Sequence, residues 1–294
     1  MALISARNQE SNLTRYSIRI SIVSFAEPFQ ILEKALGSID KAIERVGIGQ
    51  FECIPELVIV DNAGRYCKES SDKNLYIEAS KYSHFNLNII GGHGNIGYGS
   101  AHNLSLGDST EAYHLFLNPD VELSADSLKF GLEYLEDNPR VSMVTPWAID
   151  SFAVKQYLNK RFPTVFDLLI RIFDRLSRKI FLRRYAEYEM HDLSEELPTV
   201  GIPLASGCFM LCRNSAVLDV GGFDPEYFLY FEDFDLSMRL SKISKIAYLP
   251  DMKIKHLGGN ASKKGWLHLY YFVRSGIRFF NCYGWSWFRR KRLT

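Results

Sequence analysis

The sequence predicts an α/β protein built on an open sheet flanked by helices, and two observations support this prediction. Short apolar, β-branched runs recur at residues 18–25, 57–60, 87–90 and 113–117, a pattern typical of strands covered on both faces. Residues 28–46 carry apolar side chains at helical spacing, and a second helix is expected from about residue 100. Strand, turn and helix therefore alternate along the first part of the chain.

Composition is that of a folded globular protein. The 294 residues are 47% hydrophobic and 23% charged, enough to bury a large core. The net charge of +1 gives the molecule no strong field, and the sequence has no basic patch with base-stacking spacing. We therefore exclude nucleic acid as a partner.

Cysteines and termini indicate a reducing compartment. The five cysteines lack any CxxC spacing, so we expect small buried apolar residues and neither zinc nor disulfides. The first 17 residues have no apolar core for a signal peptide, and no uninterrupted apolar stretch reaches the length of about 18 residues that spans a bilayer. The sequence thus predicts a cytoplasmic protein, either soluble or peripheral to a membrane.

Polar side chains follow the ends of the predicted strands. Asp61 and Asn62 follow the second strand, Asn95 follows the third, and Asp120 follows the fourth. Any one of them alone is more simply a turn residue. Ligands of an open α/β sheet bind at the carboxyl ends of its strands, so the four polar residues at these three strand ends together predict a binding site.

Residues 91–99 are rich in glycine. Gly92, Gly94 and Gly97 match the G-x-G-x-x-G pattern of dinucleotide sites, but they follow the third strand and lack the acidic partner about 20 residues on. We therefore prefer a close approach of the backbone to a bound nucleotide-sugar, with Asn95 and Asn103 presenting amides. A tight strand-to-helix turn is the alternative.

Three carboxylates, Glu232, Asp233 and Asp235, directly follow the aromatic run at residues 227–231. Carboxylates are rarely placed in an apolar context without a partner or a chemical task, so the segment predicts a general base or a metal ligand. Two simpler explanations stay open: Asp235 is spaced for an ion pair with Arg239, and acidic residues stabilise the first turn of a helix.

A second candidate site combines Asp120, in the segment Asn118-Pro119-Asp120, with His256. A diphosphate leaving group needs a divalent cation, and magnesium or manganese prefers one or two carboxylates together with phosphate oxygens. His256 offers an imidazole that could complete the coordination. The alternatives are a turn aspartate and a structural histidine.

Two basic, aromatic segments interrupt or extend this pattern. We divide the chain into an N-terminal tail (1–16), a main domain (17–260) with a basic amphipathic helical insertion (150–197), and a C-terminal extension (261–294). Both the insertion and the extension interleave aromatic residues with arginine and lysine. Such segments contact an anionic membrane surface, or pack on the core and display a solvated basic face.

Taken in order, these segments resemble an inverting family 2 glycosyltransferase of the GT-A fold, most closely its rhamnosyltransferase-like members. The resemblance implies a Rossmann-like open mixed sheet flanked by helices. Eight short motifs carry it: residues 21–25, residues 60–63, residues 94–99 with Asn103, residues 117–120, residues 205–207, residues 221–224, residues 232–235, and His256.

The resemblance also implies roles for single residues. Asp61 would hydrogen-bond a pyrimidine base, and Ser24 and Phe25 would line its pocket. Asp120 would hold a divalent cation, Mg²⁺ or Mn²⁺, with help from His256. The catalytic base would be Asp233, with Glu232 beside it. The nucleotide-sugar site would further include Asn62, Asn95, Gly97, Tyr98, Asn103, Asn118, Ser206 and Gly207.

The chain departs from the family at Asn118, where the common Asp-x-Asp motif begins with aspartate. A neutral amide is a poorer cation ligand, so this departure puts the metal requirement in question. Asn-Pro-Asp is found in rhamnosyltransferase-like members, which is one reason to prefer them.

The expected function is transfer of a sugar, with L-rhamnose from dTDP-L-rhamnose favoured, to a hydroxyl of a lipid-linked saccharide. The product would be a bacterial surface polysaccharide, such as O-antigen, capsule or cell wall, made at the inner face of the cytoplasmic membrane. A UDP-sugar donor is the nearest alternative. A sugar-nucleotide pyrophosphorylase or a non-catalytic sugar-binding module are alternatives of other classes, the latter supported by Asn118.

Overall fold

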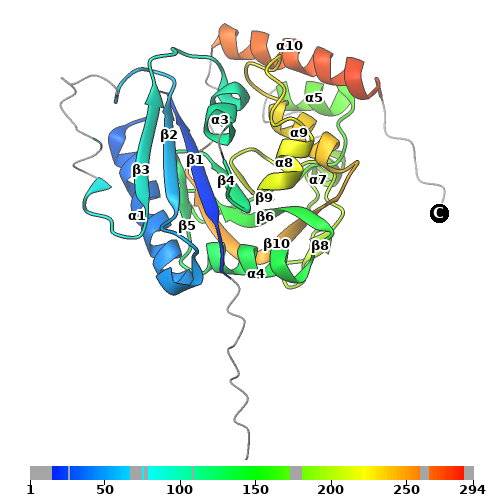
Figure 1. Ribbon diagram of the computed structural model, residues 1–294. Helices are drawn as coiled ribbons and strands as arrows, with labels where there is room; N and C mark the ends of the chain where they lie inside the picture. The colour runs from blue at the N-terminus through cyan, green and yellow to red at the C-terminus, as the bar shows by residue number, and fades with distance from the viewer. Residues whose placement is uncertain are drawn as a thin grey trace, which may run out of the picture.

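The computed structural model describes residues 15–25, 27–66, 75, 79–107, 109–172, 181–258 and 265–287. Within these residues the strands form one mixed sheet, eight of whose strands follow the order β3-β2-β1-β4-β9-β6-β10-β5 (Figure 1). This arrangement confirms the predicted open mixed sheet flanked by helices.

One half of the sheet is parallel and matches the four predicted strands. The strands β1 (Ile18–Ser24), β2 (Glu56–Asp61), β3 (Asn86–Gly91) and β4 (Tyr113–Leu117) all run in the same direction. Three of them are almost wholly buried, as expected. The third, β3, lies at the sheet edge and is only partly covered, because no strand protects its outer side.

The other half is mixed and was not foreseen in full from the sequence. The strand β9 (Phe209–Arg213) runs antiparallel between β4 and β6 (Val141–Ile149), and β10 (Lys245–His256) runs parallel to β6. Three short strands complete this half: β5 (Val121–Leu123) and β8 (Thr199–Val200), which pair with β10, and β7 (Lys155–Gln156), which pairs with β6.

Helices cover both faces of the sheet. On one face α1 (Phe29–Val46), preceding the short η1 (Ile48–Gln50), packs beside α4 (Ser127–Asp137). The opposite face carries α3 (Tyr98–Leu106), α8 (Asn214–Asp219) and α9 (Glu232–Leu240) (Figure 1). The helix predicted over residues 28–46 is therefore confirmed.

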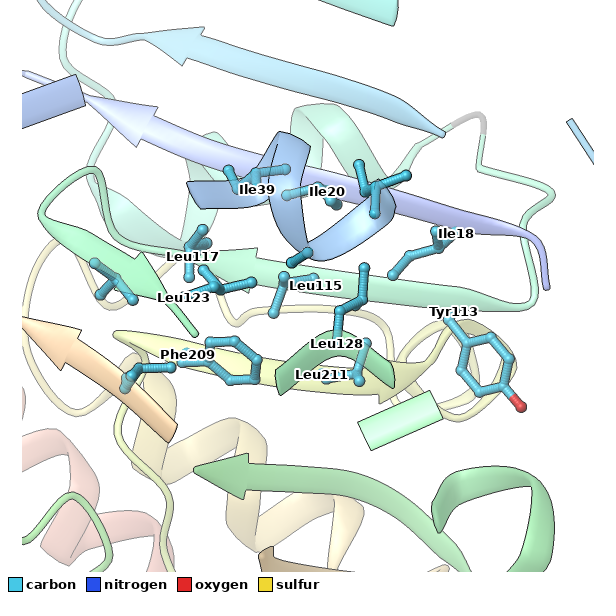
Figure 2. Close-up of a cluster of buried hydrophobic side chains, with 14 of the residues drawn as sticks. Ile18, Ile20, Ile39, Tyr113, Leu115, Leu117, Leu123, Leu128, Phe209 and Leu211 are labelled. Carbon is cyan, nitrogen blue, oxygen red and sulfur yellow. The ribbon is translucent and has the colours of Figure 1, made fainter. Parts of the chain in front are cut away.

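The largest core cluster lies between the sheet and the pair α1 and α4, as Figure 2 shows. Ile20 of β1, Leu115 of β4 and Leu211 of β9 are fully buried there. Ile39 of α1 and Leu128 of α4 pack against them from the helical layer. Burying such a side chain stabilises the fold by about 1.5–3 kcal/mol, so this layer holds the strand ends in fixed positions.

Three further helices complete the described fold. The insertion contributes α5 (Val165–Ile172) and α7 (Leu182–Tyr188), and the C-terminal extension forms α10 (Trp266–Tyr283). Residues 173–180 and 288–294, which carry many of the basic side chains noted above, lie outside the described residues. Of the helices described, none has both the length and the apolar character required to cross a bilayer.

The cysteines only partly match the expectation of burial. Cys208 and Cys212 are buried, whereas Cys53 and Cys282 are exposed, and all four are free thiols. Cys67 lies outside the described residues. Cys53 lies in the loop after η1 and Cys282 near the end of α10, and both side chains are exposed there.

Candidate functional site

Asp61 lies at the carboxyl end of β2 and is fully buried. One of its carboxylate oxygens accepts a hydrogen bond from the Ala63 N–H (3.2 Å) and the other from the Tyr66 N–H (2.7 Å). The carboxylate therefore stabilises the turn after β2. The predicted contact between Asp61 and a pyrimidine base stays a prediction.

Ser24 lies next to Asp61 in the β1–β2 register. Its hydroxyl donates a hydrogen bond to the Glu27 carboxylate, which also accepts one from the Phe25 N–H (3.0 Å). The Phe25 ring is half exposed, as a ring that stacks on a ligand would be. The sequence analysis missed Glu27, although an acidic residue three positions beyond a strand end was a signal for it.

Asn62 links this turn to the glycine-rich segment. Its side-chain amide donates to the Gly97 carbonyl (3.0 Å), and the side-chain carbonyl of Asn95 accepts from the Gly97 N–H (3.1 Å). Gly97 has a φ of +91°, and a Cβ there would collide with the Phe228 carbonyl oxygen. Only glycine fits this position, so this glycine allows two backbone segments to meet.

Tyr98 continues the connection toward the carboxylates. Its backbone N–H donates to the Phe228 carbonyl (3.1 Å), and its hydroxyl donates to the Gly207 carbonyl (2.7 Å). The Gly207 N–H in turn donates to Asp233 Oδ2 (2.9 Å). A continuous series of bonds thus runs from the turn after β2 to the start of α9.

Asn103 of α3 binds the protein backbone through its side-chain amide. Both ends of its side-chain amide bind the backbone of Phe223, at 2.7 and 2.9 Å. These two bonds fasten α3 to the turn at residues 221–224. Asn103 therefore stabilises the protein itself, and its contact with a nucleotide stays a prediction.

Glu232 and Asp233 occupy the first turn of α9. The two preceding residues, Tyr230 and Phe231, have φ of +69° and +66°, a left-handed conformation that is rare for large side chains. The strain is placed directly before the carboxylates, as is common at functional sites. Asp233 Oδ1 accepts from the Phe234 N–H (2.9 Å), so two backbone donors hold this carboxylate.

Glu232 is buried, and burial raises the pKa of its carboxyl well above the ordinary value, with the neighbouring Asp233 charge adding to the effect. One of its oxygens has no hydrogen-bond partner among the described residues. Glu232 therefore holds its proton more tightly than an exposed glutamate does.

Asp235 serves the structure, as the simpler explanation predicted. It forms an ion pair with Arg239 (2.6 Å) and accepts a hydrogen bond from the Tyr283 hydroxyl (2.7 Å). The predicted i,i+4 pair is therefore confirmed.

Asp120 and His256 meet because β5 pairs with the end of β10. The Leu257 N–H donates to the Asp120 carbonyl (2.9 Å), and His256 Nε2 lies 3.5 Å from Asp120 Oδ1. On its other side, His256 Nδ1 lies 2.8 Å from Gln156 Oε1, and Gln156 Nε2 donates to the His256 carbonyl (3.0 Å). Gln156 was missed, since nothing in the sequence marks a glutamine of a two-residue strand.

The pair fits a hard divalent cation. Among the described residues, His, Cys, Asp and Glu form no group of three or more that could enclose a metal, but one or two protein ligands suffice where phosphate or water completes the shell. A Cβ on Gly258 would lie 2.8 Å from Asp120 Oδ2 and would also collide with His256 Nε2. The missing side chain therefore keeps space open beside both ligands.

The segments that carry Asp120 and Asp233 meet at residues 207 and 208. Burial raises the pKa of this thiol to about 12, and the nearby charges of Asp120 and Asp233 contribute in the same direction. The Asn118 N–H donates to the Cys208 carbonyl (2.9 Å), and the Ser206 hydroxyl accepts from the Cys208 N–H (3.4 Å). Residues 207 and 208 thus connect the segment of the predicted metal ligand Asp120 with the predicted base Asp233.

Known structures share this architecture at low sequence identity. The crystal structure of GalNAc-T7 with UDP, GalNAc and Mn²⁺ aligns with 82% of this chain and 43% of that chain, with a TM-score of 0.59 and 14% identity. The mannosyltransferase PcManGT from Pyrobaculum calidifontis, in complex with GDP-Man and Mn²⁺, aligns with 92% of this chain and 77% of its own, with a TM-score of 0.55 and 12% identity. The chain has the GT-A glycosyltransferase fold.

Sequence relatives agree with this GT-A assignment. The rhamnosyltransferase WbbL of Escherichia coli K12 is 28% identical over 179 residues, 58% of this chain and 64% of WbbL, so the match spans less than two thirds of that relative. The N-acetylglucosaminyl-diphospho-decaprenol L-rhamnosyltransferase of Mycobacterium tuberculosis is 28% identical over 240 residues, 76% of this chain and 71% of that protein. No protein-family model matches the chain. The predicted resemblance to rhamnosyltransferases is confirmed.

Proposed function

We propose that this GT-A protein is an inverting glycosyltransferase that moves a sugar from a nucleoside diphosphate to an acceptor hydroxyl. The observation that carries the proposal is that the segments bearing Asp233 and Asp120 meet at residues 207 and 208. The Gly207 N–H donates to Asp233 Oδ2 (2.9 Å), and the Cys208 carbonyl accepts from the N–H of Asn118, two residues before Asp120 (2.9 Å). Asp233 suits proton transfer, and the Asp120–His256 pair suits a cation that binds the diphosphate.

The reaction is a single displacement. The acceptor oxygen forms a bond to the anomeric carbon on the face opposite the diphosphate, while the bond from that carbon to the phosphate oxygen breaks. The hydroxyl proton passes to Asp233, whose carboxylate is oriented by the N–H groups of Gly207 and Phe234. General-base catalysis of this kind contributes about 10²–10⁴-fold to the rate.

Asp120 and His256 would hold the divalent cation, Mg²⁺ or Mn²⁺. When bound, such an ion neutralises the charge that grows on the departing diphosphate. Mn²⁺ in the structures of GalNAc-T7 and PcManGT supports this assignment. With Asn118 in the first position of the Asp-x-Asp motif, the chain supplies one carboxylate from this segment, so we expect the cation to bind together with the nucleotide.

For the donor we favour dTDP-L-rhamnose, with a UDP-sugar as the alternative. The names of both sequence relatives include rhamnosyltransferase, and that of the mycobacterial protein also names a sugar-diphospho-decaprenol acceptor. By analogy we propose a lipid-linked saccharide as acceptor, in the synthesis of a bacterial surface polysaccharide.

A lipid-linked acceptor requires contact with a membrane, and α10 offers a surface for it. Its outer side exposes Trp266, Leu267, Tyr270, Val273 and Ile277, and the sequence continues beyond α10 into a basic stretch. We name these five residues the α10 face. Aromatic side chains beside basic residues suit the interface of an anionic bilayer, so we propose peripheral binding to the inner face of the cytoplasmic membrane.

Replacing Asp233 with Asn tests the proposed base. The D233N variant keeps the shape of the side chain but cannot accept the proton, so we expect transfer to fall by at least about 100-fold while donor affinity stays unchanged. Turnover is followed by release of the nucleoside diphosphate, and donor binding by calorimetry. Asp219, exposed at the end of α8, provides the matched control D219N. A D233N variant with near-normal turnover would show that another group is the base.

A further inference from the structure

We propose that Gln156 is a positioning residue that fixes the tautomer of His256, so that the Nε2 lone pair faces Asp120. The inference rests on the metal site proposed above. It concerns a residue that lies outside the eight sequence motifs.

The hydrogen-bond chemistry of Gln156 leaves one arrangement. The backbone carbonyl of His256 can only accept, so the nitrogen of the Gln156 amide must face it, at 3.0 Å. The amide oxygen is then the atom that lies 2.8 Å from His256 Nδ1. An amide oxygen can only accept, so Nδ1 carries the hydrogen. In the neutral ring, Nε2 therefore has the free lone pair.

The position of Gln156 is set by strand pairing and not by a flexible loop. The strand β7 pairs with the end of β6, with Gln156 opposite Ala148, and Ile254 of β10 pairs with Ala148 from the other side. Gln156 therefore reaches across the end of β6 to His256. Because it binds both the ring and the backbone of His256, it restrains rotation of the ring as well as its tautomer.

This orientation matters for the cation. His256 Nε2 and Asp120 Oδ1 are 3.5 Å apart, beyond an ordinary hydrogen bond. In this tautomer each presents a lone pair to the other, so the arrangement favours a positive ion between them. The partner on the second nitrogen of a histidine ligand commonly has this orienting role, and its loss costs about 10–100-fold in metal affinity.

The first experiment reads the tautomer in the metal-free protein. Long-range ¹⁵N–¹H NMR of the histidine rings, with H256A to assign the signals, should show His256 protonated at Nδ1 at pH 8. We expect Gln156→Leu to shift the ring toward the Nε2-protonated form. We expect Gln156→Glu to keep the Nδ1–H form, because a carboxylate also accepts from Nδ1, although it loses the donor to the carbonyl. An Nε2-protonated ring in the unaltered protein would overturn the inference.

The second experiment measures Mn²⁺ affinity by electron paramagnetic resonance, with dTDP or UDP present. We expect Q156L to bind Mn²⁺ about 10–100-fold more weakly and Q156E to stay within about threefold of the unaltered protein. The exposed Gln30 gives the matched control Q30L, and circular dichroism confirms folding. A folded Q156L with unchanged affinity would refute the role of Gln156. Absence of Mn²⁺ binding by the unaltered protein would refute the proposed metal site instead. The NMR measurement of the His256 tautomer would then still test the role of Gln156.

Discussion

At the scale of single residues, the site depends as much on a missing side chain as on the charged ones. Gly258 leaves open the space beside Asp120 and His256. We predict that Gly258→Ala weakens Mn²⁺-dependent donor binding by at least about tenfold, because its methyl group would displace a ligand. Calorimetry with and without Mn²⁺ measures the effect.

The matched control for this substitution is Gly49→Ala, since a Cβ at Gly49 meets nothing within 4 Å. It should bind donor as the unaltered protein does. Equal Mn²⁺-dependent binding by G258A and G49A would contradict the assignment of this space to the cation.

A second residue-scale prediction concerns two buried histidines. His102 and His114 both lie within hydrogen-bond distance of the Ser21 hydroxyl, at 2.7 and 2.9 Å. Burial lowers the pKa of His102 to about 3, and burial also lowers that of His114 well below its ordinary value, with His102 and Arg19 contributing. The folded protein therefore binds these two protons less readily than the unfolded chain, which titrates near pH 6.5.

The sign of the effect follows from this difference. The contribution of these two histidines to the free energy of unfolding is fully present above pH 6.5. It is lost as the pH falls from there toward 3, with a slope of up to about 1.4 kcal/mol per pH unit for each histidine. Urea unfolding between pH 7.5 and 5 measures the slope. The double variant H102Q/H114Q should show a flatter dependence, and an unchanged slope in that variant would exclude these histidines as its source.

How far single residues could be predicted depends on the range of their contacts. Asp61 and Asp120 were placed correctly at strand ends, because the carboxyl ends of parallel strands meet along one edge. Gln156 binds His256 across 100 positions of sequence, through a register that only the folded sheet defines. Asn103 binds Phe223, 120 positions away, and no local pattern in the sequence indicates that contact.

At the scale of elements, local pattern predicted the parallel half of the sheet and not the mixed half. The strands β1, β2 and β4 are continuous apolar runs with turn residues after them, and these signals are local. The position of β9 between β4 and β6 depends on pairing between segments that are distant in the sequence. No local pattern in the sequence indicates this strand order, so only the fold class could be predicted for the mixed half of the sheet.

The α10 face yields the element-scale prediction. Replacing Trp266 and Tyr270 with Glu should weaken binding to vesicles that contain phosphatidylglycerol by at least about 100-fold, since each buried aromatic contributes about 1.5–3 kcal/mol. Vesicle flotation measures the loss. Ile243 is 55% exposed in the turn after α9, outside both segments predicted to contact the membrane, so Ile243→Glu is the control.

Other results would change the assignment of this face. The unaltered protein could fail to bind vesicles and instead form a dimer that the Trp266 and Tyr270 substitutions dissociate. The α10 face would then be a contact between two copies of the chain. Binding that persists in the doubly substituted protein would place the membrane contact elsewhere.

At the scale of the whole molecule, binding of the donor should stabilise the fold. A ligand at 100 times its Kd adds about 2.7 kcal/mol, which raises the Tm of a protein larger than 150 residues by roughly 5–10 °C. We predict the largest shift for dTDP-L-rhamnose with Mn²⁺, and smaller shifts for UDP-sugars or for L-rhamnose alone.

The same thermal screen separates the rival activities. A pyrophosphorylase would instead be stabilised by a nucleoside triphosphate and would release pyrophosphate from it in the presence of a sugar phosphate. A sugar-binding module without activity would respond to saccharides and would never cleave a nucleotide-sugar.

The contacts of α10 have a consequence for how such experiments must be designed. Ser275 donates to the Leu229 carbonyl (2.8 Å), and the hydroxyl of Tyr230 lies 2.9 Å from His268 Nδ1. The ring of Phe231 packs against Phe279 of the same helix. These contacts brace the left-handed pair of residues that precedes Asp233. Deletion of α10 would therefore remove the support of the residues that precede Asp233 as well as the proposed membrane surface. Only point substitutions on the α10 face can distinguish a loss of membrane binding from a loss of catalysis.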